Sequence, residues 1–134
     1  MTEIDIICAA LCIWKEARND LDGMRGVMNV LLNRAKRNSD SVYAEVFKPL
    51  QFSSMSYQHD PQLLRQPNPN HPEEWQAWLN AKTVATSAST GVFEDNTAGA
   101  TSYYSTTMDD NPPSWGRKMV PTVVIGGQRF FRTA

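Results

Sequence analysis

Apolar residues recur at helical spacing in three parts of the chain. The first run predicts a helix over residues 3–18, and the second predicts a helix that Asp20 or Asp22 could cap. A third helix is expected to start near Pro72, because proline suits the first helical position. The expected core faces are Ile4, Ile7, Cys8, Leu11 and Cys12; then Met24, Val27, Met28, Leu31, Leu32 and Ala35; then Trp75, Trp78, Leu79, Lys82, Ala85, Thr86 and Ser89, with both tryptophans as core anchors.

The end of the chain carries a β-hairpin signal. Residues 122–125 and 128–131 flank Gly126-Gly127, a pair that favours a tight two-residue turn. Segments 51–72 and 94–121 are predicted to be loops, the first because its prolines cannot sit inside a regular element, and the second is interrupted by the short stretch Ser102-Tyr103-Tyr104. Loops of this length are usually functional or disordered, and their aromatic and polar residues favour a binding cleft. The pattern therefore predicts a mainly α fold of the α+β class with a small C-terminal β-hairpin.

Length and charge narrow the class of protein. With 134 residues, the chain has room for a single domain over residues 1–134. Thirteen Lys and Arg against fourteen Asp and Glu give a net charge of −1. Nucleic-acid binders that depend on phosphate contacts are usually basic, so no nucleic-acid partner is expected. No apolar run approaches the roughly 18 residues of a transmembrane helix, so no membrane insertion is expected.

The N-terminus, the cysteines and the histidines give three further expectations. Residues 1–5 are acidic where a secretory signal is basic, which predicts cytoplasmic synthesis without a signal peptide. Cys8 and Cys12 are four residues apart, and their Cβ atoms on a helix would be about 5–6 Å apart, beyond the reach of a disulfide. We expect two buried, unbridged thiols. No metal is expected, because the only histidines, His59 and His71, lie in the Pro-rich loop.

Short motifs follow one another over nearly the whole chain. They are Glu16-Ala17-Arg18 with Gly23-Met24 and Val30-Leu31-Leu32-Asn33-Arg34; Gln51-Phe52-Ser53; Asp95 with Gly99-Ala100; Tyr103-Tyr104 with Asn111-Pro112-Pro113-Ser114-Trp115; and Ile125-Gly126-Gly127-Gln128-Arg129-Phe130-Phe131. In this order they resemble the spore-cortex-lytic cell-wall hydrolases of the SleB type. The resemblance implies a lysozyme-like helical domain that cleaves peptidoglycan glycan strands. One departure is Asn96, which stands where the family usually has proline.

Glu16 is the candidate catalytic residue. Breaking a glycosidic bond requires an acid that protonates the leaving oxygen, with a pKa raised toward neutrality. Glu16 lies at the margin of the apolar stripe of the first helix and near its negative C-terminal end, which disfavours ionisation, whereas Arg18 acts in the opposite sense. The resemblance assigns the same role to Glu16.

Two mechanisms could cleave the glycosidic bond, and only hydrolysis needs a second carboxylate. Hydrolysis uses a carboxyl pair, about 5–5.5 Å apart in retaining enzymes and about 6.5–9.5 Å apart in inverting ones. The candidates are Asp20, Asp22, Asp95, Asp109 and Asp110, although capping, turn and surface roles explain them more simply. Alternatively, a single acid donates its proton and then accepts that of the muramic acid 6-hydroxyl, which closes a 1,6-anhydro ring. The resemblance implies this lytic transglycosylase chemistry.

Five further residues are candidates for substrate binding. Gln51 and Ser53 could hydrogen-bond acetamido or hydroxyl groups. Tyr103 and Tyr104 would point to opposite faces of a strand, and we favour Tyr104 for the cleft. Trp115 could stack on a sugar, and burial explains it equally well.

These observations predict a peptidoglycan-degrading enzyme that cleaves the MurNAc–GlcNAc bond as a lytic transglycosylase. It is expected to be a monomer without cofactor. A chain without export signal or wall-binding domain suits a phage or prophage endolysin that a holin releases to the cell wall. Two alternatives remain: a hydrolytic lysozyme with a second carboxylate, and a non-catalytic wall-binding or virion component.

Overall fold

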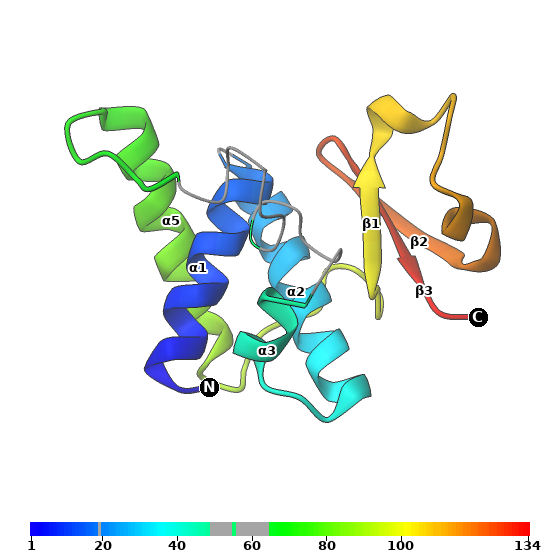
Figure 1. Ribbon diagram of the computed structural model, residues 1–134, viewed down its shortest axis with the longest axis horizontal. Coiled ribbons are helices and arrows are strands. Elements are labelled where there is room, and N and C mark those ends of the chain that lie inside the picture. Colours follow the sequence, from blue (N-terminus) through cyan, green and yellow to red (C-terminus); the bar gives the residue numbers. More distant parts are fainter. Residues whose placement is uncertain (19, 49–54, 56–64) are drawn as a thin grey trace.

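The computed structural model places the helices on one side of the molecule and a small sheet on the other (Figure 1). It describes residues 1–18, 20–48, 55 and 65–134. The principal elements are α1 (Glu3–Ala17), α2 (Leu21–Asn38), α3 (Val42–Val46), α5 (Pro72–Ala88), β1 (Ser102–Ser105), β2 (Val120–Ile125) and β3 (Gln128–Arg132). Two short 3₁₀ helices, Thr106–Met108 and Ser114–Lys118, lie between β1 and β2. The mainly helical α+β fold is confirmed.

Helix α1 lies within the predicted range, but only part of its predicted core face is buried. Thr2 caps it: the Asp5 backbone N–H donates to the Thr2 hydroxyl at 3.1 Å, and the Thr2 N–H donates back to the Asp5 carboxylate at 2.8 Å. Ile4 is 62% exposed and Ile7 is 45% exposed, so the expected stripe is wrong at its N-terminal half. The core side of α1 is formed instead by Ala9, Ala10, Cys12, Ile13 and Trp14.

Helix α5 starts at Pro72 as predicted, but of its two tryptophans only Trp78 packs against the core, and Trp75 is not a core anchor. Trp75 and Trp78 are only half-buried, and Trp78 packs edge-on against Trp14 with ring centroids 6.4 Å apart. The residues that α5 buries are Ala77, Ala81, Val84, Ala85 and Ala88. Small side chains allow α5 to lie close against α1, which places the large rings at the margins of the contact.

Helix α2 lies between α1 and the sheet (Figure 1). Its predicted core face is confirmed, with Leu32 half-buried and the other members buried. A Cβ added at Gly26 would lie 2.6 Å from Cζ of Phe130, so only glycine lets this ring rest on the helix. The predicted hairpin is β2–β3, and β1 pairs with the other edge of β3, giving the antiparallel order β1-β3-β2. The third strand completes a sheet that the hairpin signal alone did not predict.

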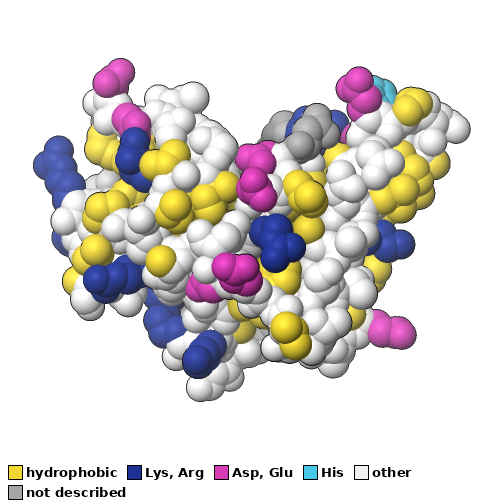
Figure 2. All heavy atoms as spheres, turned by 180° about the vertical axis from the view of Figure 1, so that it is seen from behind, with side chains coloured by type: hydrophobic (Ala, Val, Ile, Leu, Met, Phe, Trp, Pro, Cys, Tyr) yellow, Lys and Arg dark blue, Asp and Glu magenta, His cyan; other side chains and the backbone are white. Residues whose placement is uncertain are grey.

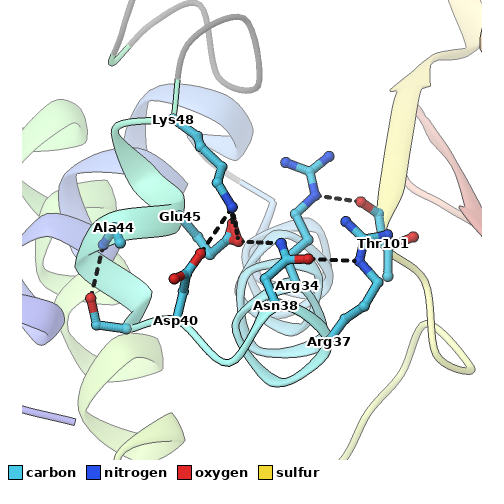
Figure 3. A network of polar contacts seen from close by, with 9 residues as sticks. Arg34, Arg37, Asn38, Asp40, Ala44, Glu45, Lys48 and Thr101 are labelled. Carbon is cyan, nitrogen blue, oxygen red and sulfur yellow. Dashed lines mark hydrogen bonds and ion pairs between the residues drawn. The ribbon is translucent and has the colours of Figure 1, made fainter.

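A polar network ties α2 to α3 and to β1 (Figure 3). Glu45 is fully buried and accepts hydrogen bonds from Asn38 at 2.6 Å and from Lys48 at 2.9 Å. Arg34, also buried, donates from Nε to the Thr101 carbonyl at 2.5 Å. Burial lowers the pKa of Arg34, although Tyr103 and Glu45 oppose that shift. Arg34 therefore fixes the chain directly ahead of β1.

The structure can be compared with the predictions for the surface charge, membrane spans, cysteines and metal sites. Charged side chains of both signs are mixed on the face shown in Figure 2, as the small net charge predicts. Within the described ranges, no helix is long and apolar enough to cross a membrane. Both thiols are free; Cys12 is buried as expected, whereas Cys8 is only half-buried. The same ranges hold no group of three His, Cys, Asp or Glu residues that could bind a metal ion.

Candidate active site

Glu16 lines a groove between the helices and the hairpin. It lies in the last turn of α1 and is half-buried, and the adjoining open cavity has a volume of about 400 Å³. In Figure 1 the β2–β3 turn points toward the neighbouring ends of α1 and α2. The lining residues are Lys15, Glu16, Ala17, Arg18, Asp20, Ser105, Gly127 and Gln128. The predicted place of Glu16, at a helix end beside a cleft, is therefore confirmed.

Tyr103 holds the Glu16 carboxyl from the sheet side. Its hydroxyl donates to Oε1 of Glu16 at 2.8 Å. Tyr103 pairs with Phe130 across β1 and β3, and their rings lie 5.5 Å apart. Burial and the negative charge of Glu16 raise the pKa of Tyr103 well above its ordinary value, so the hydroxyl remains a donor throughout the neutral range. The carboxyl is thereby fixed by a donor that stays protonated.

Tyr104 points away from Glu16, which corrects the preference for it in the cleft. Its ring stacks on Phe131 at 5.2 Å and meets Trp115 edge-on at 5.9 Å. Trp115 also packs edge-on against Phe131, at 5.6 Å. The alternation of the two tyrosines across the strand is as predicted, but their assignment to the two faces is reversed. Trp115 belongs to this aromatic cluster, in which it is half-buried and Phe131 is buried, and a stacking role on sugar stays a prediction.

Gln128 and Cys12, which the sequence did not single out as site residues, also adjoin Glu16. Gln128 donates from Nε2 to the Glu16 carbonyl at 3.4 Å, which joins the start of β3 to the end of α1. Cys12, one turn before Glu16, is buried; burial and the Glu16 charge raise the pKa of its thiol. Gln51 and Ser53 lie outside the described residues, so their hydrogen bonds to substrate stay predictions.

Two of the candidate second carboxylates are engaged in the fold. Asp95 accepts from the Thr97 N–H at 2.8 Å and from the Gly99 N–H at 3.0 Å, as a turn residue does. Burial would raise the pKa of Asp95, but the donors from Thr97 and Asn33 hold it below its ordinary value. Asp109 receives two hydrogen bonds from Arg129, at 3.1 and 2.9 Å, and these lower its pKa.

The remaining candidates separate by position. Asp22 and Asp110 are exposed, and neither is among the described residues that line the groove. Asp20, in contrast, is one of the residues that line the groove.

Asn96 connects its loop to α2. Its side-chain amide accepts a hydrogen bond from Asn29 at 3.1 Å and donates one to the Asp22 carbonyl at 3.2 Å. These bonds tie the loop to α2 without the proline that the family usually has.

We expect Tyr103→Phe to leave the fold intact and to reduce kcat by about tenfold to a hundredfold. The reason is that a hydrogen bond to a charged group contributes roughly 1.5–3 kcal/mol, and the phenyl ring keeps the packing on Phe130. Initial rates of muropeptide release from sacculi measure the effect, with Tyr104→Phe as the matched control. Equal rates for Tyr103→Phe and the unmodified enzyme would refute a positioning role for this hydroxyl.

Comparisons with known proteins identify the family and the fold of the chain. A family model described as cell wall hydrolase matches residues 18–131. The fold is similar to the catalytic domain of the germination-specific lytic transglycosylase SleB from Bacillus anthracis, with a TM-score of 0.73, 24% identity, and coverage of 98% of this chain and 97% of that one. The catalytic domain of Bacillus cereus SleB gives a TM-score of 0.73, 25% identity, and coverage of 98% and 91%. A sequence comparison with curated proteins gave no match. Since the family model spans most of its length, the chain belongs to the cell wall hydrolase family and has the fold of the SleB catalytic domains.

Proposed function

We propose that this cell wall hydrolase cleaves the MurNAc–GlcNAc bond of peptidoglycan as a lytic transglycosylase, with Glu16 as its single acid–base group. The observation that carries the proposal is the Tyr103 hydroxyl at 2.8 Å from Glu16 Oε1, at the edge of an open groove. The likeness to a SleB domain described as a lytic transglycosylase supports the same chemistry. Asp95 and Asp109 are already engaged by donors of the fold, which leaves them poorly suited to a second catalytic role.

Glu16, held by Tyr103, can act in both steps of this reaction, the cleavage of the glycosidic bond and the closure of the anhydro ring. With Tyr103 as a donor at Oε1, the transferable proton of Glu16 is best placed on Oε2. Glu16 donates this proton to the glycosidic oxygen as the bond to C1 of MurNAc breaks. The carboxylate then accepts the proton of the 6-hydroxyl, whose oxygen bonds to C1 and closes the 1,6-anhydro ring. Atoms balance without water, because the proton gained by the leaving sugar is replaced by the one from the 6-hydroxyl.

Hydrolysis is the second candidate, because Asp20 lines the same groove as Glu16. In that case a water would be added across the bond, with the second carboxylate acting as nucleophile or base. Mass spectrometry of sacculi digested by the purified protein separates the two reactions. Anhydromuramic ends are expected, whereas reducing MurNAc ends would make the protein a hydrolytic lysozyme. Sacculi that release no soluble muropeptide would favour a non-catalytic wall-binding or virion component.

The biological setting is a further proposal. Action as a monomeric phage or prophage endolysin, made in the cytoplasm and released by a holin, stays a prediction of the sequence. Expression of this protein in a bacterial host with and without a holin tests the proposal. Lysis is expected only when the protein and the holin are both present.

A further inference from the structure

Asp20 occupies the N-cap position of α2 without acting as a side-chain cap. Its carbonyl accepts the first helical hydrogen bond, from the Met24 N–H at 2.8 Å, so the predicted cap position is correct. Its carboxylate, however, makes no capping hydrogen bond. An N-cap aspartate ordinarily accepts from a backbone N–H two or three residues on. The ion pairs within the described ranges engage Asp40, Glu45, Glu74 and Asp109 rather than Asp20.

Two glycines from separate elements make room for this carboxylate. A Cβ at Gly23, in the first turn of α2, would lie 2.9 Å from Oδ2 of Asp20. A Cβ at Gly126, in the β2–β3 turn, would overlap Oδ2 and lie 3.2 Å from Cγ. Gly126 also has a φ of 58°, in the left-handed region that favours glycine. The carboxylate is therefore seated against the hairpin turn, on a groove that Glu16 also lines.

We propose that Asp20 is a substrate-binding residue whose carboxylate accepts a hydrogen bond from a donor of the glycan strand, a sugar hydroxyl or an acetamido N–H. This inference rests on the proposed function. An ionised carboxylate only accepts hydrogen bonds, and both of these sugar groups are donors. Because no capping bond and no ion pair among the described residues uses the Asp20 carboxylate oxygens, their acceptor capacity is left for a ligand in the groove. The position of this carboxylate is fixed by its close packing against Gly23 and Gly126.

The first test compares Asp20→Asn and Asp20→Ser with Asp22→Asn, using muropeptide release from sacculi at varied concentration. Asn and Ser cap helices about as well as Asp, so stability should change little. The apparent KM should rise about tenfold or more in Asp20→Ser, as expected for loss of a charged hydrogen bond, and by a smaller factor in Asp20→Asn, whose amide oxygen still accepts, while kcat stays within about twofold in both. Asp22→Asn, an exposed change in the same turn, should alter neither constant.

The outcomes separate three explanations. A fall in kcat as deep as that of Glu16→Gln would overturn the proposal and make Asp20 a catalytic carboxylate. An unchanged KM together with a lowered melting temperature would assign Asp20 to the fold alone. A wild-type protein that releases no soluble muropeptide would refute the proposed function itself, whereas an active wild type with unaltered Asp20 variants would refute only this inference.

A second test moves the carboxylate without replacing it. Gly126→Ala places a methyl group where Oδ2 of Asp20 lies, so the apparent KM should rise as in Asp20→Ser. Gly91→Ala is the matched control, because Gly91 has a similar φ of 80° and nothing within 4 Å of an added Cβ. Both variants should lose stability from backbone strain, but only Gly126→Ala should weaken binding. In the Asp20→Ser background, Gly126→Ala should add little to KM; full additivity would contradict the shared mechanism.

Discussion

Glu16→Gln is expected to abolish most lytic activity while leaving the fold nearly unchanged. The amide has the size of the carboxyl and can still accept the hydrogen bond from Tyr103, so packing at the end of α1 should persist. It cannot donate a proton to the glycosidic oxygen or accept one from the 6-hydroxyl. General acid–base groups contribute about 10²–10⁴-fold, and a group used in both half-steps should lie at the upper end of that range.

Turbidity loss of permeabilised cells or sacculi measures this effect, with circular dichroism as the folding control. Asp20, Asp22, Asp95, Asp109 and Asp110, each changed to Asn, form the comparison set. Each should cost far less than Glu16→Gln if one carboxyl performs the chemistry. A folded aspartate variant that is as inactive as Glu16→Gln would replace the single-acid mechanism with a two-carboxylate hydrolase.

Element positions could be predicted from the sequence more reliably than the faces they bury. Caps and prolines are local signals, and they placed α2 and α5 correctly. Helix α1 is apolar on more than one side, so spacing could not choose between Ile4 with Ile7 and the buried Ile13 with Trp14. In α5, close packing against α1 selects alanines, which a search for the largest apolar side chains overlooks.

The candidate site shows the same division between local and distant causes. A helix end and the family resemblance sufficed to predict the place of Glu16 beside the groove. Strand alternation separates Tyr103 from Tyr104, but the pairing of β1 with β3 decides which of them meets Glu16. From the sequence, Asp20 is predicted to be an ordinary helix cap. Only the structure shows that Gly126, distant in sequence, leaves room for its carboxylate. The burial of Arg34 likewise depends on Thr101, and nothing near Arg34 in sequence signals it.

Phe130→Ala is expected to lower the free energy of unfolding by about 3–5 kcal/mol, the usual cost of emptying a buried phenylalanine site. Phe130 is fully buried, rests on Gly26 of α2, and packs its ring 5.5 Å from that of Tyr103. Its loss should therefore weaken the contact between helices and sheet and loosen the Tyr103–Glu16 hydrogen bond. Denaturant unfolding followed by tryptophan fluorescence gives the free energy by linear extrapolation.

The control for Phe130→Ala is Val124→Ala, a 47% exposed position on β2, which should cost less than about 1 kcal/mol. A double-variant cycle locates the effect at the helix contact. Gly26→Ala alone brings a methyl group to 2.6 Å from Cζ of Phe130 and should destabilise by overpacking, typically about 1–3 kcal/mol. In the Phe130→Ala background the same methyl group enters vacated space, so Gly26→Ala should cost much less or even stabilise the protein. If the two changes in the free energy of unfolding were strictly additive, the Phe130 ring would not pack against α2 at Gly26. The packing described between the sheet and α2 would then be wrong.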